Sequence, residues 1–111
     1  MVENLTTRWD KAVQETMGKD GTVYDDSPCI VILNNERIVV SYKCPIDNKT
    51  YEYSGENDGN GHYSLECEIL TGHAHLHFHT DKKGHKCLIG EYTEDGTDGF
   101  WKIRLEGEKI I

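Results

Sequence analysis

Several features are scarce or missing in this sequence of 111 residues, and each absence narrows the class of protein. No apolar run approaches the roughly 18 residues that span a bilayer as a helix, so we expect no transmembrane helix. The residues after Met1 show no basic region followed by an apolar segment, so we expect no secretory signal and a cytoplasmic protein. Only 2 prolines interrupt a chain with 11 glycines, which is compatible with one folded domain spanning residues 1–111.

Basic residues are also few. Lys and Arg number 12 against 20 Asp and Glu, which gives a formal charge of −8 with neutral histidines. Such a chain lacks the excess of cations that binds nucleic acid or anionic lipid. We therefore expect no nucleic acid or membrane partner, and instead a small molecule, a metal ion or a basic protein, bound by a monomer or homodimer.

The cysteines lack the spacing of a zinc knuckle or a redox pair. Cys29, Cys44, Cys67 and Cys87 are 15, 23 and 20 positions apart, with no Cys-x-x-Cys motif. We expect free thiols. Cys29, Cys67 and Cys87 lie in strand-like runs, where a cysteine behaves as a small apolar residue.

The first part of the chain has apolar residues at helical spacing, namely Leu5, Trp9, Ala12, Val13 and Met17. Asn4 or Thr7 can cap the start, Asp10 stands three residues after Thr7 as in a capping box, and Gly18 offers a stop. The pattern predicts an amphipathic helix over about residues 4–17.

After this segment the apolar period changes to two, and turn residues recur about every 8 to 12 positions. This pattern predicts seven or eight antiparallel strands, at about 22–25, 29–33, 36–42, 49–54, 62–70, 73–80, 85–93 and 100–106. Short turns favour a meander that closes into a small β-barrel over about residues 22–108, or a half-open barrel or sandwich. A two-residue turn at Asn34 and Asn35 pairs Val31 with Ile38 and leaves this hairpin apolar on both faces. We expect the helix to cover its second face.

The run Gly90-Glu-Tyr-Thr-Glu-Asp-Gly-Thr-Asp-Gly-Phe-Trp-Lys-Ile-Arg-Leu resembles the closing hairpins of small lipocalin-like or calycin-like barrels. There, a Gly-x-Tyr or Gly-x-Trp strand precedes a Gly-Phe-Trp-like strand. The resemblance covers about 16 residues and implies only the fold, because fold does not fix function. The first strand lacks the usual Gly-x-Trp of the family.

The most unusual segment places a histidine at every second position, at His73, His75, His77 and His79. In a strand these four imidazoles share one face. A two-residue turn at Thr71 and Gly72 would place Glu68 opposite His75 and Glu66 opposite His77. His75, His77, Glu66 and Glu68 are then candidate ligands for zinc or another first-row metal.

Two alternatives to the metal site stay open. The same residues can form hydrogen-bonded cross-strand pairs on a solvated face. A slip of one residue would instead turn the histidines into the barrel and create a polar pocket.

Nothing in the sequence combines a nucleophile with an activating base and an oxyanion hole, so we expect a protein that is not an enzyme. The favoured function is a small β-barrel that binds a small molecule through aromatic residues at its mouth or interior. The candidate ligand-binding residues are Tyr51, Tyr53, Tyr63, Phe78, Tyr92 and Trp101. The alternatives are an acidic module that inhibits a basic protein, as immunity or anti-defence proteins do, and the His/Glu metal-binding protein.

Overall fold

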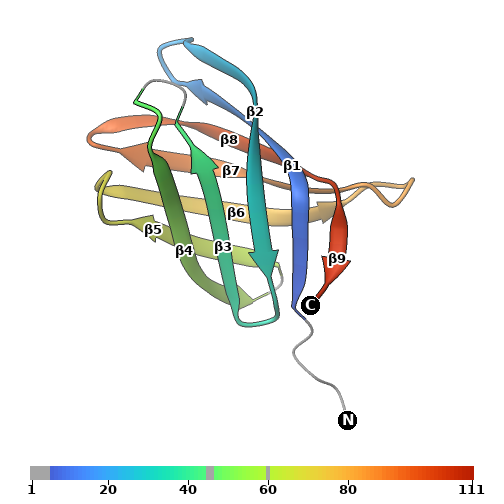
Figure 1. Ribbon diagram of the computed structural model, residues 1–111. Coiled ribbons are helices and arrows are strands. Elements are labelled where there is room, and N and C mark those ends of the chain that lie inside the picture. Colours follow the sequence, from blue (N-terminus) through green and yellow to red (C-terminus); the bar gives the residue numbers. More distant parts are fainter. Residues whose placement is uncertain (1–5, 45–46, 60) are drawn as a thin grey trace.

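The computed structural model describes residues 6–44, 47–59 and 61–111, and in this part of the chain every regular element is a β-strand (Figure 1). The nine strands are β1 (Thr7–Gly18), β2 (Val23–Leu33), β3 (Arg37–Lys43), β4 (Thr50–Gly59), β5 (His62–Cys67), β6 (Gly72–Thr80), β7 (Lys86–Glu94), β8 (Thr97–Leu105) and β9 (Glu108–Ile110). All the pairings are antiparallel.

The first eight strands form a closed barrel. Each strand pairs with its successor from β2 to β8, and β1 pairs with β2 on one side and with β8 on the other. Closure leaves no exposed edge along these strands, which removes the unpaired backbone groups that invite aggregation. The closed barrel of eight antiparallel strands is compatible with a lipocalin-like fold.

The turns alternate between the two ends of the barrel. Those after β1, β3, β5 and β7 lie at one end, and those after β2, β4 and β6 lie at the other (Figure 1). The β6–β7 hairpin extends beyond the barrel wall. We call the end that carries the turns after β1, β3, β5 and β7 the tyrosine end, because Tyr42, Tyr51 and Tyr53 lie near it.

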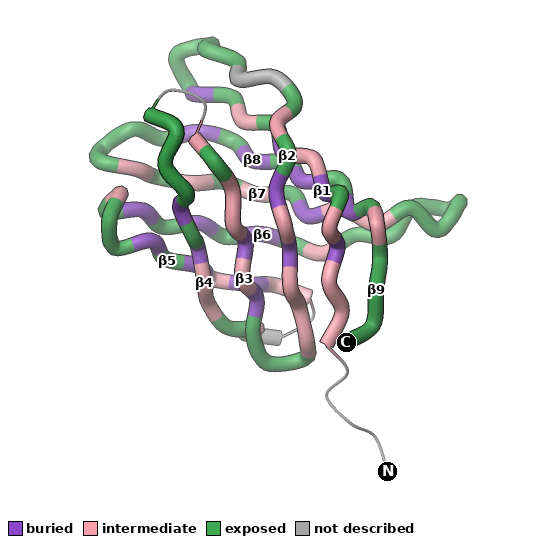
Figure 2. The backbone as a smooth tube through the Cα atoms, viewed as in Figure 1, coloured by how far each residue is buried: buried purple, intermediate pink, exposed green. Residues whose placement is uncertain are grey.

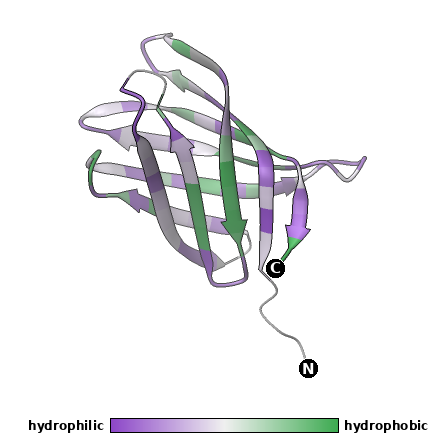
Figure 3. Cartoon of the chain, in the orientation of Figure 1, coloured by the Kyte–Doolittle hydropathy of each residue, from purple (hydrophilic) through white to green (hydrophobic). Residues whose placement is uncertain are grey.

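Side chains from every strand except β9 fill the barrel interior. Buried positions recur along these strands in Figure 2. The largest fully buried side chains are Tyr53, Ile38, Leu65, Leu76, Leu88, Ile103, Val31 and Val40. The most continuous apolar stretch runs along β2 (Figure 3). Burial of apolar surface at about 25 cal/mol per Å² is the main force that stabilises such a core.

The N-terminal helix predicted from the sequence is wrong, because Thr7–Gly18 forms β1. The helical spacing arises from a β-bulge: Trp9 pairs with Val31 and Ala12 with Cys29, so β1 has one residue more than β2 in this interval. Trp9 and Ala12 therefore both face the core although they are three positions apart. An isolated helix of this length is marginal, whereas a strand here closes the barrel.

The first two predicted strands are one strand, β2, and the hairpin after it has a different register. Val31 pairs with Val40 rather than with Ile38, because the side chain of Asn34 accepts hydrogen bonds from the backbone N–H groups of Glu36 and Arg37 and builds a longer turn. No helix covers the outer face of this hairpin in the described residues. The outward side chains Ile30, Ile32 and Val39 are half-buried.

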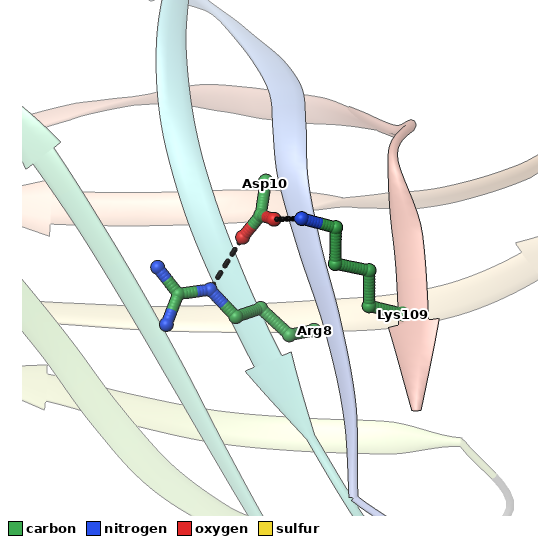
Figure 4. A network of polar contacts seen from close by, with 3 residues as sticks. All are labelled: Arg8, Asp10 and Lys109. Carbon is green, nitrogen blue, oxygen red and sulfur yellow. Dashed lines mark hydrogen bonds and ion pairs between the residues drawn. The ribbon is translucent and has the colours of Figure 1, made fainter. Parts of the chain in front are cut away.

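The short strand β9 continues the barrel wall beside the first residues of β1, where Thr7 pairs with Ile110. The Asp10 carboxylate lies between two cations in this region: it accepts a hydrogen bond from Arg8 and forms an ion pair of 2.8 Å with Lys109 (Figure 4). These hydrogen-bonded cations hold the pKa of Asp10 below its usual value. None of the described segments is a helix with the length and hydropathy needed to cross a membrane.

Candidate functional site

The tyrosine end combines a cluster of aromatic rings with a carboxylate that one of them contacts. Tyr53 of β4 stacks on Tyr42 of β3 at a ring-centroid distance of 6.5 Å and meets the Trp101 ring edge-on at 5.1 Å. Tyr42 also meets Trp101 at 6.3 Å. Alternation places all three side chains on the inner face, because Tyr42 shares its face with Val40, and Trp101 with Ile103.

Glu94, the last residue of β7, supplies the carboxylate. The Tyr53 hydroxyl donates a hydrogen bond of 2.5 Å to Glu94 Oε1. A carboxylate offers about four acceptor positions, so this bond leaves capacity for a further donor. Glu94 is half-buried, whereas the Tyr53 ring is fully buried.

The phenols of this end stay protonated at neutral pH. Burial, followed by the charge of Glu94, raises the pKa of Tyr42 above its ordinary value. Burial and the hydrogen bond to Glu94 raise the pKa of Tyr53 in the same direction. At the neighbouring β3–β4 turn, a hydrogen bond to the Asp47 carboxylate raises the pKa of Tyr51 to about 12. The same bond lowers the pKa of Asp47. The carboxylates Glu94 and Asp47 therefore meet neutral phenols at this end.

A buried amide fixes Trp101. Gln14 of β1 accepts a hydrogen bond of 2.9 Å from Trp101 Nε1 and donates one of 3.2 Å to Ser27 Oγ. Gly72 fits under Tyr53, because a Cβ there would lie 2.2 Å from the phenol oxygen. The rings of this end are therefore held in place by specific contacts.

The six predicted ligand-binding residues separate into different parts of the barrel. Tyr51, Tyr53 and Trp101 lie at the tyrosine end, where the half-buried Tyr92 contacts the backbone of Gly99 so closely that a Cβ at that glycine would lie 2.6 Å from its ring. Tyr63 is buried opposite Leu76, and Phe78 packs against Trp9 at a centroid distance of 6.5 Å.

Tyr42, Glu94 and Gln14 are not among the site residues predicted from the sequence. The spacing along each strand could have indicated the first two. Tyr42 is two residues from Val40, and Glu94 is two residues from Tyr92, so each pair shares one face of its strand. Glu94 lies one residue beyond the predicted strand at about 85–93. No feature of the sequence indicated a role for Gln14, because the segment that contains it was predicted to be a helix and is strand β1.

The histidines of β6 point outward. His73, His75, His77 and His79 are exposed, while Ala74 and Leu76 between them are buried. His62 of β5 is directly opposite His77, and the two rings stack at a centroid distance of 4.1 Å. We call His62, His73, His75, His77 and His79 the histidine face.

The predicted register between the fifth and sixth strands is wrong. Glu66 pairs with His73 rather than His77, with an Oε1 to Nδ1 distance of 3.6 Å, and Ser64 rather than Glu68 is opposite His75. The cause is a longer turn in which the Thr71 N–H donates to the Glu68 carbonyl oxygen and Thr71 adopts a positive φ of 48°. The four predicted ligands His75, His77, Glu66 and Glu68 therefore do not meet as one set. Among the described residues, no group of three or more His, Cys, Asp or Glu side chains is placed to hold a metal ion as they stand.

Comparison of the chain with protein-family models, curated proteins and solved structures found no match. The basic-protein partner predicted from the charge stays a prediction. Phe100, Met17 and Val23 are exposed apolar neighbours across β8, β1 and β2.

Proposed function

We propose that the protein is a non-enzymatic binding protein whose tyrosine end takes a small cationic ligand, such as an amine or a quaternary ammonium compound. The observation that supports this proposal is the half-buried Glu94 carboxylate beside Tyr53, with Tyr42 and Trp101 in the same cluster. Aromatic faces attract cations by about 0.5–2 kcal/mol, and a carboxylate adds a direct charge.

The charges around this end favour a cation. The four turns and the strand residues next to them carry five acidic residues, Asp20, Asp47, Glu68, Glu94 and Asp95, and three basic residues, Lys19, Lys43 and Lys49. Like-signed charges that surround an opening raise the local concentration of ions of opposite sign. The excess of carboxylates therefore favours an amine over an anionic ligand.

The filled interior supports binding at the surface of the tyrosine end over binding deep inside the barrel. Leu65, Leu76 and Leu88 are fully buried along the barrel, and Tyr53 is fully buried behind Tyr42. Barrels of eight strands are commonly filled by side chains or hold one small ligand. Among the inward-facing side chains of the tyrosine end, Tyr42, Tyr92 and Glu94 are half-buried and therefore accessible to a ligand.

The experiment compares choline with its neutral isostere 3,3-dimethylbutan-1-ol. A Trp9→Phe variant leaves Trp101 as the single tryptophan, so its fluorescence reports on the tyrosine end. We expect saturable binding of choline and at least tenfold weaker binding of the alcohol. Glu94→Gln should lower the affinity for choline about tenfold, because it removes the negative charge beside the aromatic rings. A tenfold change in affinity corresponds to about 1.4 kcal/mol.

The matched control is Glu91→Gln, which removes one carboxylate from the same strand but from its outer face. It should leave choline affinity unchanged. Equal binding of choline and the alcohol, or equal losses in the two variants, would contradict the proposal.

A further inference from the structure

We propose that His62, His75 and His77 of the histidine face bind one divalent transition-metal ion on the outside of the barrel. The site differs from the one predicted from sequence, because it gains a histidine from β5 and loses both glutamates. It is independent of the tyrosine end, since the three histidines lie on the outer face of the wall.

The register brings the three imidazoles together. His62 is directly opposite His77, and His75 is two positions along the same strand. The ring centroids of His62 and His77 are 4.1 Å apart, and those of His62 and His75 are 5.7 Å apart. The three imidazoles are therefore neighbours on the outer wall, and rotation of the His77 side chain would bring its ring toward an ion held by the other two.

Two of these rings are already oriented by second partners. The Asp58 carboxylate lies 3.2 Å from His62 Nδ1, and Ser64 Oγ lies 3.1 Å from His75 Nδ1. Both contacts engage Nδ1, which leaves Nε2 as the nitrogen for an ion. A metal-binding histidine usually has its other ring nitrogen held by a carboxylate, a carbonyl or water. Asp58 and Ser64 would therefore act as positioning residues.

The surroundings favour a cation. Glu91 of β7 is opposite His75, while the residue opposite His77 is the apolar Ile89. A neighbouring depression of about 890 Å³ on the outer wall has four glutamates and one arginine in its lining, namely Glu52, Glu56, Glu66, Glu68 and Arg37. Imidazole ligands favour Zn²⁺, Ni²⁺ or Cu²⁺. Three imidazoles around such an ion leave a fourth coordination position for water.

The stacked rings must separate before they bind an ion together. His77 lies against His62 with an interplanar angle of 29°, an arrangement in which the two ring faces rather than the ring nitrogens meet. His77 is exposed, so its ring has room to turn into solvent while His62 and His75 keep their contacts with Asp58 and Ser64. The proposal thus requires a change of rotamer and no movement of the strands.

The experiment is a Zn²⁺ titration of the untagged protein by calorimetry at pH 7.5, repeated with single variants. We expect one ion per chain, and at least a tenfold loss of affinity in each of His62→Gln, His75→Gln and His77→Gln. Asp58→Asn and Ser64→Ala keep all three ligands and should weaken binding by 10- to 100-fold, the usual effect of such partners. Circular dichroism would verify that every variant folds.

The controls separate this site from indiscriminate binding by a histidine-rich strand. His73→Gln and His79→Gln change the same strand outside the proposed triad, and His85→Gln changes a histidine that pairs with Asp81 at the β6–β7 turn. All three should bind Zn²⁺ within about twofold of the parent protein. Full affinity in His62→Gln, or equal losses in His62→Gln and His79→Gln, would overturn the proposal.

Discussion

Gln14 and Trp101 form a buried hydrogen bond of 2.9 Å between β1 and β8, the two strands whose pairing closes the barrel. The indole N–H has only one hydrogen to donate, and Gln14 supplies its acceptor. Gln14 is the one polar or charged residue among the buried positions of the described chain. Its amide therefore links barrel closure to the placement of a ring at the tyrosine end.

Replacement of Gln14 by Leu should lower the free energy of unfolding by about 1–3 kcal/mol, because it leaves the Trp101 N–H buried without an acceptor. Urea denaturation measures the change. Ser27→Ala removes only the outer partner of the amide and should cost less than about 1 kcal/mol. In a double-mutant cycle, Trp101→Phe should cost less in the Gln14→Leu background than in the parent. Additive effects would show that the hydrogen bond does not couple the two residues.

Gly72→Ala should destabilise the barrel by more than about 1 kcal/mol, since its methyl group would lie 2.2 Å from the fully buried Tyr53 oxygen. The additional change Tyr53→Phe removes that oxygen and should recover part of the loss. Gly90→Ala serves as the contrast, because there the methyl group meets the backbone oxygen of His75 at 1.7 Å, which no side-chain change relieves. Thermal unfolding of Gly72→Ala, of the double variant Gly72→Ala with Tyr53→Phe, and of Gly90→Ala measures these losses of stability. A harmless Gly72→Ala would contradict the packing described for Tyr53.

The sequence was sufficient for the antiparallel strands of the barrel but not for its first strand, which was predicted as a helix, because alternation survives only where a strand is regular. In β6, the alternation of histidines with Ala74 and Leu76 predicts both the strand and its two faces. The predicted pairing with β5 was displaced by an even number of residues, so every side chain kept its face although its partner changed. The outward direction of the histidines was one of two alternatives left open.

The errors arise where local pattern and tertiary pairing disagree. The bulge between Trp9 and Ala12 mimics a helical period, and only the partner strand β2 reveals it. Turn length likewise depends on side-chain contacts such as that of Asn34 with Arg37. The tyrosine end joins Tyr42, Glu94 and Gln14 from strands far apart in sequence, so no local motif predicts it.

The Asp10 contacts predict a loss of stability in acid. Because Lys109 and Arg8 lower the pKa of Asp10 in the folded state, folding is favoured by this group above its ordinary pKa of about 3.9. That contribution disappears as the pH falls through the lower value of the folded protein. Asp10→Asn should therefore be less stable than the parent at pH 7, and the difference should shrink below about pH 4.

Urea denaturation of both proteins as a function of pH measures this effect, and 1 M NaCl should reduce the difference at pH 7 because salt screens exposed ion pairs. Asp95→Asn is a control in a turn on the other end of the barrel. A difference between Asp10→Asn and the parent that stays constant with pH would contradict an electrostatic role for Asp10.

The four free cysteines should react with thiol reagents in two classes. Cys29 and Cys67 are buried in the core, whereas Cys44 and Cys87 are half-buried. Burial raises the pKa of the Cys29 thiol to about 12, and the reactive species is the thiolate. In native protein at pH 8, iodoacetamide should therefore modify Cys44 and Cys87 first, as located by peptide mass spectrometry. In urea all four should react at similar rates, because unfolding removes both the burial and the pKa shift. Native labelling of Cys29 as fast as Cys44 would mean that β2 leaves the barrel wall on the timescale of the reaction.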